Sequence, residues 1–214
     1  MSSVHEQVLA GAKEMLRSGL TAGTSGNVSG RLADDTIVIT PSSLSYEQMT
    51  LDDLVVLDLD GNVVGGHRSA SSEKGVHLAC YREFDEVSSV IHTHPLYATM
   101  FACARIPIPA AVDEFALYVG GDVPVCDYAM SGTDQLGVNA VAKLADVGSA
   151  LLASHGMVTV GPSVERALHQ AGVVERAAQV VMGARALGGV VPLPPRVNRD
   201  FAGVYKLMFR APQE

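Results

Sequence analysis

Hydrophobic residues recur at spacings of three and four in several parts of the chain, which is typical of amphipathic helices. An S-x-x-E capping box from Ser3 to Glu6 opens the first helix, and Gly19 marks its end. Pro162 precedes the longest helix, which two glycines close. The predicted helices cover residues 4–16, 72–84, 96–104 and 163–187.

Shorter apolar runs that are rich in β-branched residues predict strands. They cover 36–40, a hairpin over 55–66, 88–92, and two strand pieces over 150–161 that meet at His155-Gly156. The stretch TAGTSGNVSGRL, residues 21–32, holds too many glycines and small hydroxyls for a helix and leads into the first of these strands. We read PLPPRVNRD, residues 192–200, as a rigid connector to a short C-terminal segment.

Predicted strands and helices alternate along the chain, which favours the α/β class. The hairpin-like pieces argue against a purely parallel sheet, so we expect a mixed sheet with helices on its faces. At 214 residues, one α/β domain is the expected organisation.

The charge and composition of the chain argue against some classes of partner. The net charge of −8 argues against nucleic acid and membrane surfaces as general partners, because both require clustered positive charge. Only 18% of the residues are charged, which suggests that some surface is buried against other subunits. No apolar run reaches about 18 residues, so we expect no transmembrane helix. The three cysteines are well separated, and we expect them to be reduced in a cytoplasmic protein.

His92 and His94 suggest a metal centre at the rim of the sheet. Side chains at i and i+2 of a strand point to the same side, so both imidazoles can reach one ion while Thr93 faces away. His155 follows another predicted strand, and Gly156 would allow a sharp turn after it. An isolated H-x-H pair more often consists of ordinary surface or core histidines. The similar position of His155 makes metal binding the favoured interpretation. We read the remaining histidines as structural or solvated: His5, His67, His77 and His169.

Three loops rich in small hydroxyls share one chemistry: TSGN at 24–27, TPSS at 40–43 and SASSE at 69–73. Their hydroxyl and backbone N–H groups could hold a phosphate without lysine or arginine, and the third loop opens a helix whose N-terminus favours an anion. Each loop taken singly is more simply an ordinary turn or helix cap. Glu73 likewise has two readings, as an acid that complements the helix dipole or as a carboxylate beside both metal and phosphate.

Taken together, these motifs resemble the class II, zinc-dependent sugar-phosphate aldolases of the L-fuculose-1-phosphate aldolase type, a group that includes L-ribulose-5-phosphate 4-epimerase. The resemblance runs from about residue 5 to 190 and rests on GTSGNVSGR, ITPSS, SSE, VIHTHP, IPIPA, YAMSGT, ASHG and the long helix after them. It implies a three-layer α/β/α sandwich around a largely antiparallel sheet. It also implies a homotetramer with active sites between subunits. Residues 1–214 would form one domain, with 190–214 an extension that could reach a neighbouring subunit.

The resemblance also implies a role for each matching residue. His92, His94 and His155 match the ligands of one Zn²⁺ per subunit, with Mn²⁺ or Co²⁺ as possible substitutes, and Glu73 matches the catalytic acid/base that can also ligate the metal. The residues that match the phosphate-binding set are Thr24, Gly26, Asn27, Ser42, Ser43, Ser71 and Ser72. The implied reaction cleaves a ketose 1-phosphate reversibly to dihydroxyacetone phosphate and an aldehyde, through an enediolate that zinc stabilises.

The chain departs from that family pattern mainly on the aldehyde side. Asp113-Glu114 stands where fuculose-type enzymes carry a tyrosine, Ser131 replaces an aromatic residue, and Tyr205 is a candidate replacement hydroxyl. Ser42-Ser43 also stands where the family often has a glycine. We therefore expect a short or deoxygenated neutral aldehyde, as from a 5-deoxypentulose 1-phosphate. The alternatives are a decarboxylase, a dehydratase, a 4-epimerase (which Glu73 disfavours, since aspartate is usual there) and a non-catalytic adducin-like domain.

Overall fold

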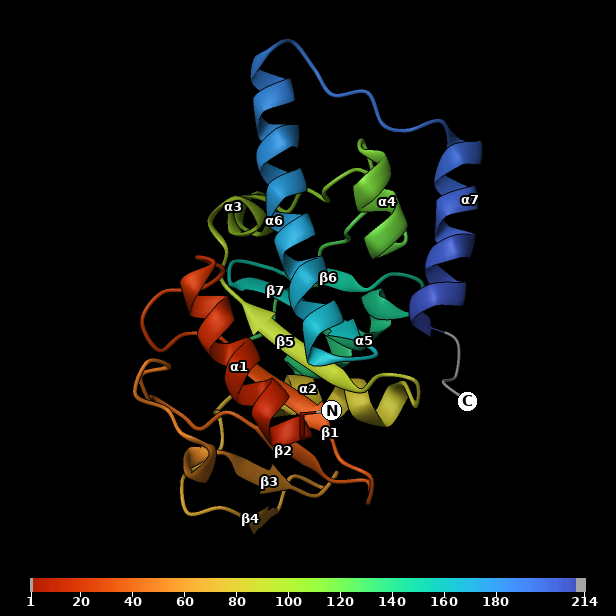
Figure 1. Cartoon of the computed structure of the whole chain (residues 1–214). Coiled ribbons are helices and arrows are strands. Elements are labelled where there is room, and N and C mark those ends of the chain that lie inside the picture. Colours follow the sequence, from red (N-terminus) through yellow and green to blue (C-terminus); the bar gives the residue numbers. More distant parts are fainter. Residues whose placement is uncertain (1, 211–214) are drawn as a thin grey trace.

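A seven-stranded sheet forms the centre of the computed structural model, which describes residues 2–210 (Figure 1). Its spatial order is β4-β3-β2-β1-β5-β7-β6, and every neighbouring pair is antiparallel. The strands are β1 (Asn27–Arg31), β2 (Ile37–Ile39), β3 (Val55–Leu57), β4 (Val63–Gly65), β5 (Ser89–Thr93), β6 (Ser149–Leu152) and β7 (Gly156–Gly161). The expected sheet is thus confirmed, and its named strands are antiparallel throughout rather than mixed.

Helices cover both faces of this sheet. They are α1 (Val4–Arg17), α2 (Lys74–Glu83), α3 (Leu96–Ala104), α4 (Asp113–Val119), α5 (Asp134–Leu144), α6 (Val164–Ala186) and α7 (Pro195–Tyr205), with single turns at Leu51–Asp53 and Lys206–Arg210. Helices α1 and α6 pack on one face, where α3 and α4 join α6, and α2 and α5 pack together on the other (Figure 1). This is the three-layer α/β/α sandwich that the sequence predicts.

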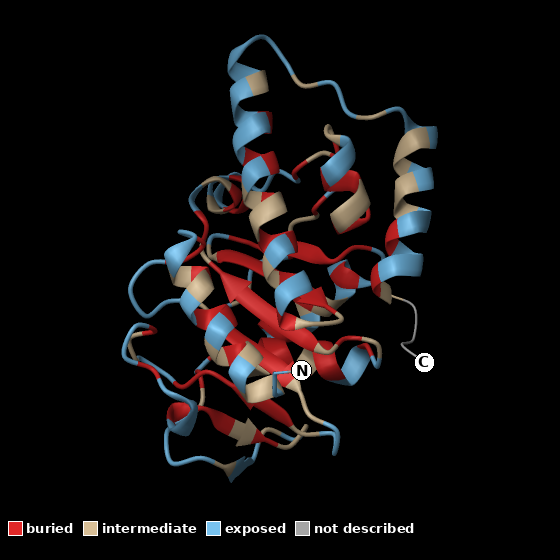
Figure 2. Ribbon diagram, in the orientation of Figure 1, coloured by how far each residue is buried: buried red, intermediate tan, exposed pale blue. Residues whose placement is uncertain are grey.

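Two apolar layers hold the sandwich together, one on each face of the sheet. On β5, Val90 packs into the layer beneath α2 and α5, whereas Ile91 packs into the layer beneath α1 and α6. Neither side chain is exposed, and the sheet is buried except at its edge strand β4 (Figure 2). His92 has the same orientation as Val90, because side chains alternate along a strand, so it faces the α2 side.

Strand β1 is not predicted by the sequence, although it lies near the middle of the sheet. Its residues lack the usual β-branched pattern because their neighbours require small or polar groups. A Cβ atom on Gly30 would lie 2.5 Å from Cγ1 of Val4, so α1 could not pack this closely over a larger residue. Ser29 is buried on the opposite side, where it takes part in a polar network.

The reading of residues 192–200 as a rigid connector is wrong for its second half, because α7 begins at Pro195. Proline is compatible with the first turn of a helix, where the missing N–H has no partner to lose. The sequence signal is an aromatic residue at every fourth position: Phe201 packs against the core, and the rings of Tyr205 and Phe209 stack at 5.4 Å. Helices α4 and α5 were not predicted either.

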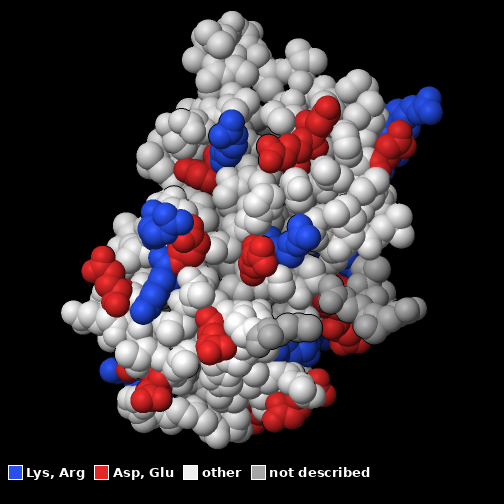
Figure 3. All heavy atoms as spheres, viewed as in Figure 1, with Lys and Arg blue, Asp and Glu red and all other residues white. Residues whose placement is uncertain are grey.

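Charged residues are mixed on the surface. On the face shown in Figure 3, Lys and Arg side chains lie among Asp and Glu side chains and form no large positive patch. Among the described residues, no helix combines the length and the hydrophobicity that crossing a membrane requires.

The close crossing of α2 and α5 yields a stability prediction. A Cβ on Gly137 would lie 2.8 Å from Cβ of Ala79 and 2.9 Å from the carbonyl oxygen of Gly75, so Gly137→Ala must push the two helices apart. Overpacking of this kind costs roughly 1–3 kcal/mol, more than the ~1 kcal/mol that alanine contributes in a helix. The matched control is Gly172→Ala in α6, where nothing lies within 4 Å of the added carbon. We expect Gly137→Ala to lower the free energy of unfolding and Gly172→Ala to raise it, measured by urea denaturation of the metal-free proteins. Equal changes in both variants would contradict the crossing described here.

Candidate active site and metal centre

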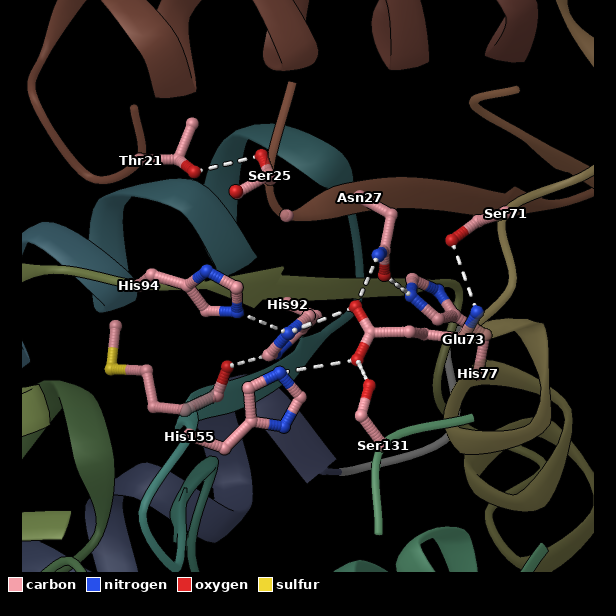
Figure 4. Close-up of polar contacts among 12 residues, drawn as sticks. Thr21, Ser25, Asn27, Ser71, Glu73, His77, His92, His94, Ser131 and His155 are labelled. Atoms are coloured by element: carbon pink, nitrogen blue, oxygen red, sulfur yellow. Dashed lines mark hydrogen bonds and ion pairs between the residues drawn. The ribbon is translucent and has the colours of Figure 1, made fainter. Parts of the chain in front are cut away.

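The ends of three elements bring four ligand side chains together (Figure 4). His92 is the fourth residue of β5 and His94 lies just beyond it, while His155 lies in the turn just before β7. Because β5 pairs with β7, with Thr93 opposite Met157, the end of one strand meets the start of the other. Glu73 immediately precedes α2 and reaches the same point from the helix layer.

These four side chains offer a compact set of donor atoms. One ligand atom from each residue can be chosen so that all lie within 4.8 Å of one another. The three imidazole rings have centroids 4.6–4.9 Å apart. Three imidazoles and one carboxylate are a donor set that suits Zn²⁺ and related divalent metals, so these residues fit a metal centre.

Hydrogen bonds orient the ligand atoms. Nδ1 of His92 lies 2.9 Å from the carbonyl oxygen of Met157, which can only accept, so Nδ1 carries the proton and Nε2 presents a lone pair. That Nε2 faces Nε2 of His94 at 2.8 Å and Oε2 of Glu73 at 3.2 Å. The other carboxylate oxygen, Oε1, lies 3.2 Å from Nε2 of His155.

The protonation states also favour metal binding. Burial raises the pKa of the Glu73 carboxyl, but its contacts with His155 and His92 outweigh burial and hold that pKa well below its ordinary value. Burial, together with the neighbouring His92 and His155, lowers the pKa of His94 to about 4. At neutral pH Glu73 is therefore ionised and His94 is neutral, which are the forms that bind a cation.

Two glycines allow the backbone to approach the ligands closely. A Cβ on Gly156 would lie 2.3 Å from the carbonyl oxygen of Thr93 and 2.5 Å from the His94 ring. The expectation that Gly156 makes the sharp turn is therefore wrong: the left-handed residue there is Ser154, with φ of 57°, and Gly156 instead leaves space for His94. Gly26 has φ of 77°, and its Cβ would lie 2.8 Å from the carbonyl oxygen of His92.

The metal centre opens into a pocket of about 210 Å³ that the three hydroxyl-rich loops surround. All seven residues of the predicted phosphate-binding set line it, together with Glu73, His94, His155, Ser131, Ser25 and Pro41. None of these lining residues is a lysine or an arginine. Ser43 adopts a left-handed backbone with φ of 58°, which agrees with the glycine that the resemblance often places there. Two larger grooves beside α1 and α6 contain none of the four ligand residues.

Only one of the predicted aldehyde-side residues lies at the pocket. Ser131 lines the pocket, and its hydroxyl donates to Oε1 of Glu73 at 2.7 Å. Asp113 and Glu114 are exposed at the start of α4 and do not line this pocket within the described chain. Tyr205 is buried, and its hydroxyl lies beside Gly148 rather than at the pocket.

Sequence reasoning missed the polar residues behind Glu73. Asn27 donates through Nδ2 to Oε2 of Glu73 at 3.1 Å, and its other amide atom, Oδ1, lies 2.5 Å from Nε2 of His77. His77, which we read as structural or solvated, is buried outside the group of four ligand residues, yet its position one helical turn after Glu73 could have drawn attention to it.

Comparison with known proteins agrees with this geometry. A family model described as "Class II Aldolase and Adducin N-terminal domain" matches residues 6–182. The chain belongs to this family. The resemblance seen in the sequence is thus confirmed, and the match covers the sheet, the four ligand residues and the three loops.

Individual relatives extend the comparison to specific enzymes. A 5-deoxy-D-ribulose 1-phosphate aldolase of Bacillus thuringiensis serovar kurstaki is 35% identical over 88% of this chain and 89% of its own. An L-ribulose-5-phosphate 4-epimerase of Salmonella paratyphi A is 33% identical over 90% of both chains. A solved structure named L-fuculose 1-phosphate aldolase matches with a TM-score of 0.91 and 35% identity, over 96% of this chain and 98% of that one.

Removing one ligand tests the metal centre. We expect His94→Ala to lose most of the divalent metal that the wild type retains after dialysis, because two imidazoles and one carboxylate remain. The matched control is His67→Ala, which removes an exposed loop histidine outside the group. Metal per chain is measured by elemental analysis. Full metal content in His94→Ala would mean that this site has been assigned incorrectly.

Proposed function

We propose that the protein is a metal-dependent aldolase that cleaves a ketose 1-phosphate reversibly to dihydroxyacetone phosphate and an aldehyde. One observation carries the proposal: the group of three histidines and Glu73 opens, through His94, His155 and Glu73, into the same small pocket as three loops of hydroxyl and backbone N–H donors. A donor set for a Lewis acid thus adjoins a site suited to an anion, as a phosphorylated ketose requires. Family membership supports an aldehyde-lyase, and the names of the relatives support the sugar-phosphate class.

The metal that best suits these donors is Zn²⁺, held by His92, His94 and His155, with Glu73 as a further ligand in the resting enzyme. Mn²⁺ and Co²⁺ are substitutes that the same donors accept. The chemistry that such an ion supplies is Lewis-acid polarisation of the substrate carbonyl and its neighbouring hydroxyl.

The phosphate would lie among the three loops. Ser71 and Ser72 come just before Glu73, the N-cap of α2, so the N-terminal end of the helix dipole complements the negative charge. Ser42 and Ser43 face the same pocket with exposed side chains. Thr24, Gly26 and Asn27 complete the set from the loop that leads into β1.

Glu73 would carry the proton. In the cleavage direction it delivers a proton to the carbon that remains with dihydroxyacetone phosphate, and in synthesis it removes that proton. Its carboxylate is well placed for both tasks because it reaches the metal ligands and the pocket at once. Ser131 and Asn27 hold one carboxylate oxygen each, which restricts its rotation.

We propose a homotetramer with active sites between subunits. Asp113 and Glu114 could then act only across a subunit boundary, since neither lines the pocket of its own chain. Tyr205 is fully buried in its own chain, so its hydroxyl does not reach a neighbouring site from this position. Large apolar side chains near the C-terminal region support such a contact: Leu187, Val191 and Leu207 are each more than 75% exposed. Within one domain spanning 1–214, the extension 190–214 would reach the neighbour. The three free cysteines agree with a cytoplasmic location.

The second candidate function is the 4-epimerase activity of the Salmonella relative. Both reactions require a divalent metal and a phosphate site, so the geometry alone accommodates either. Glu73 favours the aldolase, because the resemblance places aspartate at this position in the epimerases.

A substrate panel tests the aldolase proposal. The zinc-loaded protein is offered 5-deoxyribulose 1-phosphate, L-fuculose 1-phosphate and L-ribulose 5-phosphate, and release of dihydroxyacetone phosphate and epimerisation are both assayed. We expect kcat/KM for the truncated sugar to be at least as high as for L-fuculose 1-phosphate. A preference above about 10²-fold for L-fuculose 1-phosphate, about 2.7 kcal/mol in the transition state, would contradict that specificity. Epimerisation without cleavage would overturn the aldolase assignment.

Replacing the carboxylate separates binding from chemistry. Glu73→Gln should still bind metal through the three histidines, yet turnover should fall roughly 10²-fold or more, the usual scale for a general acid/base. The control is Glu83→Gln, an exposed glutamate at the other end of α2. Rates and metal content are measured on the same preparations. Near-normal turnover in Glu73→Gln would mean that another group moves the proton.

A further inference from the structure

A line of buried polar side chains runs from Glu73 into the interior, between β1 and α2, and Figure 4 shows its beginning at Asn27 and His77. Asn27, Ser29, His77 and Tyr81 are each at most 2% exposed. The contacts follow one another without a break: Asn27 to His77 at 2.5 Å, His77 Nδ1 to Ser29 Oγ at 2.6 Å, and Ser29 Oγ to the Tyr81 hydroxyl at 2.8 Å. Placing four polar groups in an otherwise apolar layer is costly unless each finds a partner.

The carboxylate at one end sets the direction of every hydrogen bond in this line. Ionised Glu73 only accepts, so Asn27 must present its amide nitrogen to Oε2 and its oxygen to His77. His77 must then donate from Nε2. Burial lowers the pKa of His77 to about 3, so the ring is neutral and its Nδ1 must accept.

The same reasoning gives the direction of the hydrogen bonds at Ser29 and Tyr81, the last two residues of the line. Ser29 donates its single hydroxyl proton to Nδ1 of His77, and so it accepts from the Tyr81 hydroxyl. The Tyr81 hydroxyl can donate or accept, so the directions are set from the Glu73 end, and the Nε2–H form of His77 secures the orientation of the Asn27 amide. The reverse orientation would turn the amide oxygen of Asn27 towards the Glu73 carboxylate, which repels it.

We propose that His77 is a positioning residue: by donating to Oδ1 of Asn27, it holds the Asn27 amide nitrogen towards both the Glu73 carboxylate and the anion-binding side of the pocket. One N–H of that nitrogen is bonded to Glu73, and the second, which has no partner among residues 2–210, can donate to an anionic group of the substrate. The inference rests on the proposed function, because it assigns the pocket an anionic substrate. His77 itself does not line the pocket, and its two ring nitrogens bond to Asn27 and Ser29.

This line does not act as a proton wire. A side-chain amide does not readily accept and release protons, so Asn27 interrupts any transfer between Glu73 and His77. The line can therefore affect catalysis through geometry, by fixing Asn27 and the carboxylate that Asn27 contacts.

Two substitutions at one position separate positioning from mere packing. His77→Leu keeps the approximate volume but removes the donor, whereas His77→Gln supplies an N–H near the place of Nε2. We expect His77→Leu to retain its metal, to bind inorganic phosphate roughly tenfold more weakly, and to lose 10- to 100-fold in kcat/KM, the usual range for groups that orient a ligand. His77→Gln should recover most of both losses.

Phosphate binding is measured by calorimetry on the zinc-loaded proteins, and metal content is measured beside it. A folded, metal-loaded His77→Leu with phosphate affinity and kcat/KM within about twofold of wild type overturns the proposal. So does a loss that His77→Gln fails to recover, since packing alone would then explain it. If the wild type cleaves no sugar phosphate, the proposed function fails, but phosphate affinity still decides the role of His77.

A spectroscopic measurement remains decisive even if His77→Leu does not fold. Nitrogen-15 shifts of the histidine rings distinguish the two neutral tautomers, and the signal that disappears in His77→Gln identifies His77. We expect the Nε2–H form in the wild type. The Nδ1–H form would make Nε2 an acceptor, and this would overturn the proposal.

Discussion

Strand β5 pairs with β1 on one side and with β7 on the other, and the register of these two ladders places the metal ligands and their support. Asn27 lies opposite His92 in one ladder, and Thr93 lies opposite Met157 in the other, so the turn that carries His155 is brought to the end of β5. A slip of one residue would turn His92 to the opposite face, away from Glu73. This register requires glycine at positions 26 and 156, because a side chain at either position would collide with a backbone carbonyl oxygen of β5.

The site places an ionised carboxylate and several polar groups in a largely buried position, and their mutual contacts make this tolerable. Each oxygen of Glu73 lies 3.2 Å from a histidine Nε2, where one divalent ion would contact both, and Asn27 and Ser131 donate one hydrogen bond each. A buried network is stable only when its members are satisfied, so removal of one group affects the others. The chemistry and the local stability of this end of the sheet therefore depend on the same contacts.

The sequence predicts much of this site because its chemistry depends on residue types at short spacing. His92 and His94 converge because strands alternate, and Ser71 with Ser72 adjoins Glu73 because all three open one helix. Strand β1 escapes prediction because its packing against α1 demands Gly30, and the polar line beneath it demands Ser29. Such requirements come from distant segments and leave no periodic hydrophobic signal.

The aldehyde side is harder to predict because it does not belong to one local segment. Asp113 and Glu114 lie on α4, outside the pocket of their own chain, and Tyr205 is buried on α7. Ser131, by contrast, lines the pocket and donates directly to the carboxylate of Glu73. A group that would meet the aldehyde half thus also holds Glu73, the residue proposed to transfer the proton. An aromatic side chain of the kind that the resemblance implies here would be larger and would lack the short serine hydroxyl, so serine at this position affects both the surroundings of Glu73 and the shape of the pocket.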